Sequence, residues 1–440
     1  MSSAPAHPAT SHPAGADNRI VVGGTPTTWR DLPELTLPAA PVAVLAHSAR
    51  YALAAARHHA VHGGELLLST PGRVDEAMRA ELRDAGFTVT DLGADAAGVD
   101  TAAAVAPADF RPVEHDRLWL LTSGSTGRPK RVGHTLASLT TVRGEQSART
   151  WLCPYAPGTY AWWQVVTLSL TQPGQDLVVV EPEQLDDWPA LAAAYGVDAA
   201  SGTPTFWRRI LHRDPAGLAR VPLRQLTLGG EPVDQPILDR LREVFPTARI
   251  SWIYASSEVG AAIVVHDGRA GFPAEWLDRA TPGRPTLGVR DGELVITSPH
   301  HAVGLAGPVH TGDRAQLVGD RVLITGRLHS DEINVGGSKV SAGGVRDVLT
   351  AHPRVAWARV TGRRVPLLGH LVVAEVVLTA AAPAPRPDSP TVAAPTEPTA
   401  VPDEAGLVRW CADRLPEYAV PRRIRVLTEI PVKETLKSDV

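Results

Sequence analysis

The sequence predicts an α/β fold with a large N-terminal domain of parallel-rich sheets covered by helices and a smaller α+β C-terminal domain. Two observations lead to this prediction. Short apolar runs alternate with segments of helical period up to about Leu328, which is the pattern of βαβ units. Beyond that point short strands and helices mix without this alternation. A chain of 440 residues is long enough for two domains.

The first part of the chain predicts a βαβαβ unit. Its strands and helices are expected in order at 42–45 (strand), 48–61 (helix), 65–68 (strand), 75–84 (helix) and 87–90 (strand). Further strands are expected at 118–121, 176–180, 223–228 and 249–254, separated by helical stretches such as 185–195 and 234–245. Nucleotide loops in such sheets follow the carboxyl ends of strands. We therefore expect the residues after 118–121 and after 249–254 to share one site.

The second part of the chain predicts a small domain. Its strands are expected at 332–335, 355–360 and 371–378, and its helices at 343–351 and 404–414. Residues 381–402 are rich in Ala, Pro and Thr, which predicts a disordered insertion. Residues 1–18 predict a disordered Ala/Pro/Ser tail. The predicted domains are therefore 19–327 and 328–440.

Charge and composition exclude several classes of partner. A net charge of −4 argues against a nucleic-acid partner, which would require a concentrated basic face. No apolar run reaches transmembrane length, so no membrane association is expected. The N-terminal residues lack the basic start and apolar stretch of a secretory signal. Two cysteines make no disulfide framework, and a cytoplasmic location is the simplest expectation.

The stretch TSGSTGRPK, at 122–130, is the strongest single motif. Hydroxyls, backbone N–H groups and an ammonium make it rich in donors, and its glycines allow close approach to a ligand. Such a loop suits a polyanion, most often a nucleotide phosphate. A merely flexible loop is the alternative. The candidate phosphate-binding residues are Thr122, Ser123, Gly124, Ser125, Thr126, Gly127 and Lys130.

Further motifs follow in a fixed order. They are GGEP at 229–232, YASSE at 254–258, HTGD at 310–313, GRLHSDEINVGGSKV at 326–340 and LPEYAVPRRIRVLTEIPVKETLKSD at 415–439. With the 122–130 loop, they make the chain from about Pro41 to Val440 resemble the adenylate-forming superfamily. That superfamily includes acyl-CoA synthetases, peptide-synthetase adenylation domains and luciferases. The chain is shorter than typical relatives, and we expect the opening segment before Pro41 to be missing.

The resemblance implies a binding site for ATP and Mg²⁺. The 122–130 loop would close over the β- and γ-phosphates, and Gly229, Gly230, Glu231 and Pro232 would line the adenine pocket. The remaining implied roles fall to Tyr254 (stacking on adenine), Ala255 and Ser256 (nucleotide contact, with Ala255 replacing the usual glycine), Ser257 (α-phosphate), Glu258 (Mg²⁺), Asp313 (both ribose hydroxyls) and Arg327 (phosphate or ribose). Ordinary packing for Tyr254 and a turn-stabilising role for Asp313 are the alternatives.

Lysine usage points to the same chemistry. The chain has only four lysines, Lys130, Lys339, Lys433 and Lys437, and each falls within a motif. Lys437 aligns with the catalytic lysine of the superfamily, although Leu436 replaces the glycine that usually precedes it. Lys433 is the fallback assignment, and a frayed terminal lysine is the alternative without function.

The resemblance also implies the substrates. Amino-acid-activating relatives carry a Phe-Asp pair near PYAPGTYAWW, at 154–163, whereas this stretch has no acidic residue. We therefore expect a small carboxylic acid that lacks an α-amine. Trp162 and Trp163 could line its pocket or simply pack in the core.

The small domain would be mobile, swinging about a hinge at His329, Ser330 or Asp331. This movement would admit an acceptor, which could be CoA, a carrier-protein phosphopantetheine or an amine. A non-catalytic nucleotide-binding relative is the remaining alternative.

Overall fold

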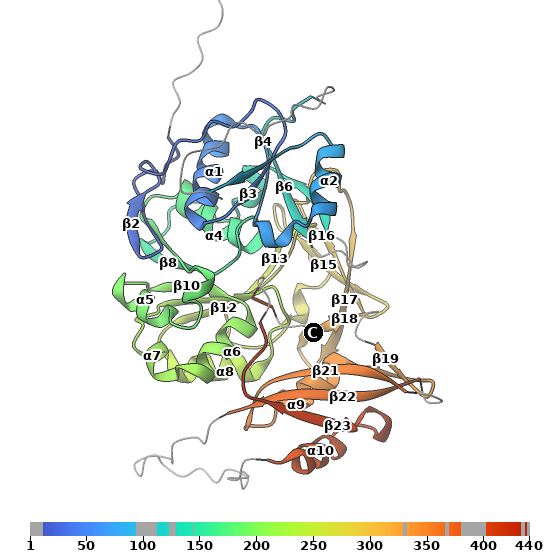
Figure 1. The fold of residues 1–440 in the computed structure, drawn as a ribbon. Helices are drawn as coiled ribbons and strands as arrows, with labels where there is room; N and C mark the ends of the chain where they lie inside the picture. The colour runs from blue at the N-terminus through green and yellow to red at the C-terminus, as the bar shows by residue number, and fades with distance from the viewer. Residues whose placement is uncertain are drawn as a thin grey trace, which may run out of the picture.

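The computed structural model describes residues 12–93, 112–122, 129–142, 144–328, 332–365, 369–379, 402–432 and 436–437. Strands of these residues form four sheets. Figure 1 shows three sheets in the larger upper part of the molecule and the fourth, built from the C-terminal strands, below them. The α/β prediction, with a larger N-terminal and a smaller C-terminal part, is confirmed.

The first sheet contains the predicted βαβαβ unit. Its strand order is β5-β3-β4-β6-β7, and only β7 runs antiparallel to its neighbour. The elements are β3 (Val42–Ala46), α1 (Ala49–His62), β4 (Glu65–Ser69), α2 (Glu76–Asp84), β5 (Thr88–Leu92), β6 (Arg117–Thr122) and β7 (Lys130–His134). Asp75 caps α2 by accepting a hydrogen bond from the backbone N–H of Met78.

The second sheet is larger and shares one apolar core with the first. Its order is β13-β12-β11-β10-β8-β9-β1-β2, with parallel pairs from β12 to β1 and antiparallel strands at both edges. Its strands are β1 (Arg19–Val22), β2 (Thr25–Thr28), β8 (Arg149–Cys153), β9 (Gln175–Val179), β10 (Ala199–Gly202), β11 (Gln225–Gly229), β12 (Arg249–Ser256) and β13 (Gly260–Val265). Between β7 and β12 the chain forms the helices α3 (Leu136–Leu139), α4 (Tyr160–Thr171), α5 (Trp188–Ala194), α6 (Pro204–Arg213), α7 (Pro215–Ala219) and α8 (Gln235–Val244).

The segment before Pro41 contributes two strands to this sheet. Ile20 and Val21, on β1, are completely buried, and β1 pairs with β9. The predicted tail extends too far, because residues 12–18 lie among those described. The amide of Asn18 donates to the backbone oxygens of Ser169 at 2.6 Å and Gln172 at 2.7 Å, at the end of α4. A segment held by polar contacts shows no apolar periodicity in its sequence. The ordered position of residues 12–18 therefore could not be predicted from their composition.

The third sheet is antiparallel, and its strands were not predicted from the sequence. Its order is β14-β18-β17-β16-β15. The strands are β14 (Phe272–Pro273), β15 (Thr286–Arg290), β16 (Glu293–Thr297), β17 (Val309–Val318) and β18 (Arg321–Arg327). In the pairing of β17 with β18, Asp313 lies opposite Arg327.

The fourth sheet and two helices form the small C-terminal part, which contains the elements that the sequence predicts and two further strands, β20 and β23. They are β19 (Glu332–Val335), β20 (Ser338–Ser341), α9 (Ala342–Thr350), β21 (Val355–Val365), β22 (Gly369–Leu378), α10 (Glu404–Ala412) and β23 (Arg423–Leu427). This part has an apolar core of its own around Leu349, Val376 and Leu407. The predicted insertion, except Pro402, and the three hinge candidates lie outside the described residues. Short 3₁₀ helices cover Pro71–Arg73, Pro182–Gln184, Ala274–Trp276 and Glu417–Ala419.

The two parts are in close contact around the beginning of α9. A Cβ on Gly343 would lie 2.1 Å from the backbone oxygen of Thr325 on β18, so only glycine fits there. Arg314 of β17 forms an ion pair with Glu332 of β19 at 3.1 Å. The C-terminal segment, dark red in Figure 1, rises from the small part into the middle of the molecule. None of the helices in the described ranges is long and apolar enough to cross a membrane.

Candidate active site

Tyr254, Asp313 and Arg327 meet at one end of the candidate site. The Tyr254 hydroxyl donates a hydrogen bond to Oδ2 of Asp313 at 2.5 Å, and Nε of Arg327 lies 3.1 Å from Oδ1 of the same carboxylate. The three residues come from β12, β17 and β18, so folding brings together residues far apart in the sequence. Burial, followed by the charge of Asp313, raises the pKa of Tyr254 well above its usual value. Tyr254 therefore remains a neutral donor.

The backbone at Asp313 is held by the side chain of Thr311. The backbone N–H of Asp313 donates to Oγ1 of Thr311 at 3.1 Å, and Oγ1 of Thr311 donates to the backbone oxygen of Leu294 at 2.7 Å. The Asp313 side chain is 16% exposed. The turn thus presents both carboxylate oxygens toward Tyr254 and Arg327, and a ribose would have to bind alongside these partners.

The GGEP motif follows β11 and contacts the beginning of α6 through Glu231. Gly229 ends β11, and Gly230 has a φ of +82°, a conformation that favours glycine. The Glu231 carboxylate accepts hydrogen bonds from the backbone N–H and the hydroxyl of Thr205, at 2.9 and 3.0 Å. Glu231 therefore lies at the positive N-terminus of α6, where a carboxylate is stabilised. The partly buried Pro232 follows.

Thr203 and Thr205 belong to this arrangement but were not predicted from the sequence. Thr203 caps α6 by accepting from the backbone N–H of Phe206 at 3.1 Å, and Pro204 occupies the first helical position. A threonine followed by proline is a recognised signal for a helix start. This signal could have located the beginning of α6 beside the GGEP motif.

Lys437 lies against this motif, although the residue also keeps an exposed surface. A Cβ placed on Gly230 would lie 3.3 Å from Cε of Lys437, so the glycine leaves room for the lysine. Burial lowers the pKa of Lys437, while the charge of Glu231 and, more weakly, that of Asp313 raise it, and Arg327 lowers it further. Lys437 thus lies within the electrostatic influence of both the GGEP motif and the Asp313 cluster. The alternative of a frayed terminal lysine stays open beside this contact with Gly230.

Leu436 explains how the C-terminal segment is held there. Its φ is +60°, which for a residue other than glycine costs about 1–2 kcal/mol. Its side chain is only 1% exposed, and burying a leucine contributes about 1.5–3 kcal/mol. Burial therefore outweighs the backbone cost. Leu436 belongs to the apolar core of the large part, and it shares a small hollow with the side chains that we call the Leu436 socket: Leu185, Trp188, Phe206, Arg209, Ile210 and Val432. The hydroxyl of Thr203 also donates to the backbone oxygen of Leu436.

The 122–130 loop is described only at its two ends. Thr122 at the end of β6 pairs with Lys130 at the start of β7, so the two strands form a hairpin that presents the loop. Ser123, Gly124, Ser125, Thr126 and Gly127 lie outside the described residues. The backbone oxygen of Leu121 accepts from Arg73 at 3.0 Å, which fixes the strand before the loop.

The turn after β12 carries the rest of the YASSE motif. Ala255 and Ser256 end the strand, and Ser256 Oγ accepts from the backbone N–H of Glu258 at 3.3 Å. The backbone oxygen of Ser257 lies 2.7 Å from Nε2 of His134. Burial lowers the pKa of His134, so the neutral ring donates through Nε2–H to that oxygen. His134, at the end of β7, was not among the predicted site residues.

Glu258 is suited to Mg²⁺ on chemical grounds. Magnesium prefers hard oxygen ligands and commonly takes one or two carboxylates together with phosphate oxygens. A group of three or more His, Cys, Asp and Glu side chains able to hold a metal is absent from the described residues. Glu258 would supply the single carboxylate of such a site, and a bound Mg²⁺ would neutralise phosphate charge there.

The region expected to form the acid pocket is largely core. Trp162 and Trp163, at the beginning of α4, are fully buried, with their rings in an edge-to-face contact at 4.9 Å. The hydroxyls of Tyr155 and Ser201 lie 3.0 Å apart. Core packing is thus the role that the structure gives to the two tryptophans.

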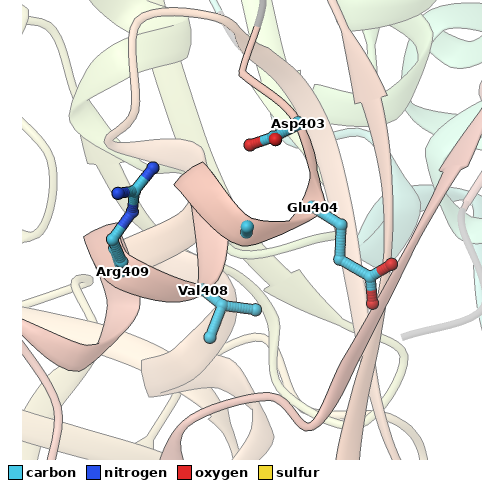
Figure 2. Close-up of a pocket in the computed structure, with 5 residues that line it drawn as sticks. Asp403, Glu404, Val408 and Arg409 are labelled. Atoms are coloured by element: carbon cyan, nitrogen blue, oxygen red, sulfur yellow. The ribbon is translucent and has the colours of Figure 1, made fainter.

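A second hollow lies on α10, away from these residues. Figure 2 shows Asp403, Glu404, Val408 and Arg409 around it. Its lining includes no residue of the candidate site. The hollow is wide open, and we assign it no role.

Comparisons with known proteins identify the family of the chain. The family model described as AMP-binding enzyme matches residues 25–303, and the one described as AMP-binding enzyme C-terminal domain matches residues 345–437. The chain is 30% identical over 243 residues to 2-succinylbenzoate–CoA ligase of Geobacillus kaustophilus, covering 49% of this chain and 45% of that protein. It is 26% identical over 470 residues to surfactin synthase subunit 1 of Bacillus subtilis, covering 91% of this chain and 12% of that protein. The chain spans about half the length of the curated relatives it matches first.

Solved structures show the same fold. The amide bond synthetase McbA of Marinactinospora thermotolerans has a TM-score of 0.62 at 22% identity, over 96% of this chain and 95% of that one. The o-succinylbenzoate CoA synthetase MenE of Bacillus subtilis, in complex with an acyl-adenylate intermediate, has a TM-score of 0.63 at 19% identity, over 97% and 94%. At these identities the likeness concerns the fold alone.

Proposed function

This chain belongs to the AMP-binding enzyme family, and from that premise we propose that it is an ATP-dependent acid ligase. A carboxylate oxygen of a small acid attacks the α-phosphorus of ATP, and the bond from that phosphorus to the pyrophosphate oxygen breaks. The products are an acyl-adenylate and pyrophosphate. The acyl group then passes to an acceptor, and AMP leaves.

The position of Lys437 is the observation that carries this proposal. A carboxylate and a polyphosphate repel each other, so the reaction needs a cation where the two meet. Lys437 lies against Gly230 and within the influence of Asp313 and Glu231. A preorganised charge in a water-poor site stabilises the charge that develops in the transition state.

We assign the other residues by the same reasoning. Asp313 and Arg327 receive the ribose, Tyr254 contacts the adenine, and GGEP lines its pocket. Ser257 donates to the α-phosphate, Glu258 holds Mg²⁺, and the 122–130 loop covers the outer phosphates. We place the boundary between the two domains at 327/328. The contact of Gly343 with β18 and the ion pair between Arg314 and Glu332 hold the domains in the arrangement that delivers Lys437.

For the acid, we propose a carboxylic acid without an α-amine. An ammonium group in the pocket would require a carboxylate partner, and PYAPGTYAWW supplies none. The short pair between Tyr155 and Ser201 adds only hydroxyls to this region. A panel of aryl, short aliphatic and fatty acids, trapped with hydroxylamine, would identify the class.

For the acceptor, we propose a thiol, either CoA or a carrier-protein phosphopantetheine. Several relatives are named as CoA ligases, including the acetyl-coenzyme A synthetase of Novosphingobium aromaticivorans at 26% identity. An amine is the second candidate, because McbA, named as an amide bond synthetase, shares the fold. Adding CoA or an amine after adenylate formation shows whether the acceptor is a thiol or an amine, because only the true acceptor yields a product with the acyl group.

A non-catalytic nucleotide-binding relative is the remaining alternative, favoured by Ala255 and Leu436 at positions where glycine is usual. The test is pyrophosphate release. Acid-dependent release of pyrophosphate supports the ligase, while thermal stabilisation by ATP without turnover supports the binding protein.

A further inference from the structure

Leu436 combines two features that rarely occur together. Its backbone is left-handed, with a φ of +60°, and its branched side chain is buried. Glycine adopts this backbone without strain, so backbone geometry alone gives no reason for a leucine. The reason must lie in what the side chain contacts.

The Leu436 side chain packs in the same apolar cluster as Trp188, Phe206 and Ile210, and most of the Leu436 socket belongs to the large domain. Trp188 belongs to α5, Phe206 and Ile210 belong to α6, and Leu185 precedes α5. The rings of Trp188 and Phe206 stack at 5.3 Å, so the wall is rigid. Because α6 also begins beside the GGEP motif, a leucine seated on α6 places the next residue, Lys437, at that motif.

We propose that Leu436 is a positioning residue whose side chain, seated in the Leu436 socket, holds Lys437 in the site. The inference rests on the proposed function only in assigning Lys437 to adenylation. The hydroxyl of Thr203 contributes by donating to the backbone oxygen of Leu436. Docking of the C-terminal segment therefore depends on a side chain that glycine could not supply.

Hydrogen exchange measured by mass spectrometry tests this without any activity. In Leu436→Ala the residue still pays the conformational cost of its positive φ, but most of the apolar surface that the leucine side chain buries is lost. Peptides covering the C-terminal residues through Leu436 and Lys437 should therefore lose about 10- to 100-fold of their protection. Leu436→Met, which conserves volume, should restore protection to within a few-fold. Leu317→Ala is the matched control, since Leu317 on β17 is 65% exposed. Unchanged protection in Leu436→Ala would overturn the proposal.

Kinetics supply a second readout. With a turning-over acid, Leu436→Ala should lower kcat of pyrophosphate release by about 10- to 100-fold while the KM for the acid stays within about threefold. A rise in that KM with kcat unchanged would contradict a positioning role. Lack of pyrophosphate release by the unaltered protein would overturn the ligase proposal, while the exchange experiment would still decide the role of Leu436.

Discussion

The hydroxyl of Tyr254 donates to Oδ2 of Asp313 at 2.5 Å, which joins the second sheet to the third at the candidate nucleotide site. Arg327 holds the other carboxylate oxygen at 3.1 Å. The two contacts orient Asp313 before any nucleoside binds. A ribose would therefore meet a carboxylate that is already fixed, so little entropy is lost in ordering it.

Asp313→Ala should raise the KM for ATP by about 10- to 100-fold, because a hydrogen bond to a charged group contributes about 1.5–3 kcal/mol. Tyr254→Phe should raise it less, by about 2- to 10-fold, since it removes a single donor to Asp313. Steady-state pyrophosphate release at varied ATP measures both. An unchanged KM in Asp313→Ala would remove this residue from the ribose site.

Lys437→Ala should lower the rate of adenylation by about 100- to 1,000-fold, as expected for removal of a preorganised charge. Thiolysis of a preformed acyl-adenylate should be nearly unaffected, because the cation serves the first step. Lys339→Ala is the control: Lys339 pairs with Glu332, and its side chain is 74% exposed. Equal loss in both half-reactions would contradict the role of Lys437.

In a plot of adenylation rate against pH, the fall at high pH (the alkaline limb) should follow the deprotonation of Lys437. Burial lowers its pKa, so the cation is lost at a lower pH than for a free lysine, and the rate falls as pH rises through that pKa. Glu231 raises the pKa of Lys437. Glu231→Gln should therefore move the limb to lower pH.

Glu243→Gln, on the exposed face of α8, is the control for this pH profile. The measurement is the rate of pyrophosphate release from pH 6 to 10 at saturating ATP. A limb that stays in place, or moves to higher pH, in Glu231→Gln would show that the two residues are not coupled.

Gly343→Ala should separate the two domains locally, because its Cβ would lie 2.1 Å from the backbone oxygen of Thr325. We expect a loss of about 1–3 kcal/mol in the free energy of unfolding, as for overpacking elsewhere. In the matched control Gly344→Ala, the nearest atom is the Ser341 Cβ at 3.6 Å. Denaturant unfolding of both variants measures the difference, and equal stabilities would argue against close contact at Gly343.

Acid stability should depend on His58. Burial, with the charges of His62 and His59, lowers its pKa from 6.5 to about 4. Between these values the unfolded chain binds a proton that the folded protein does not, so stability falls as pH drops from about 6.5 to about 4. His58→Gln should reduce this fall by about 1 kcal/mol, because solvent screens a half-buried ring. Thermal melts at pH 7 and pH 4 test it, and an identical fall in both proteins would contradict the assignment.

The sequence by itself determined the local elements and the family resemblance. The first βαβαβ unit, the order of the motifs and the helices of the small domain follow from apolar periodicity and from local signals such as Asp75, which caps α2. These are short-range properties, so a single chain displays them. Residues 12–18 escaped prediction because Asn18 is held by polar contacts to the end of α4.

Only the tertiary structure decided how the site is assembled. The antiparallel third sheet brings Asp313 and Arg327 to Tyr254, and the socket formed by α5 and α6 fixes Leu436 in a conformation that its own backbone disfavours. The sequence showed a leucine where glycine is usual, but not that its burial outweighs the backbone cost. That balance depends on side chains more than 200 positions away in the chain, and such distant contacts leave no local pattern.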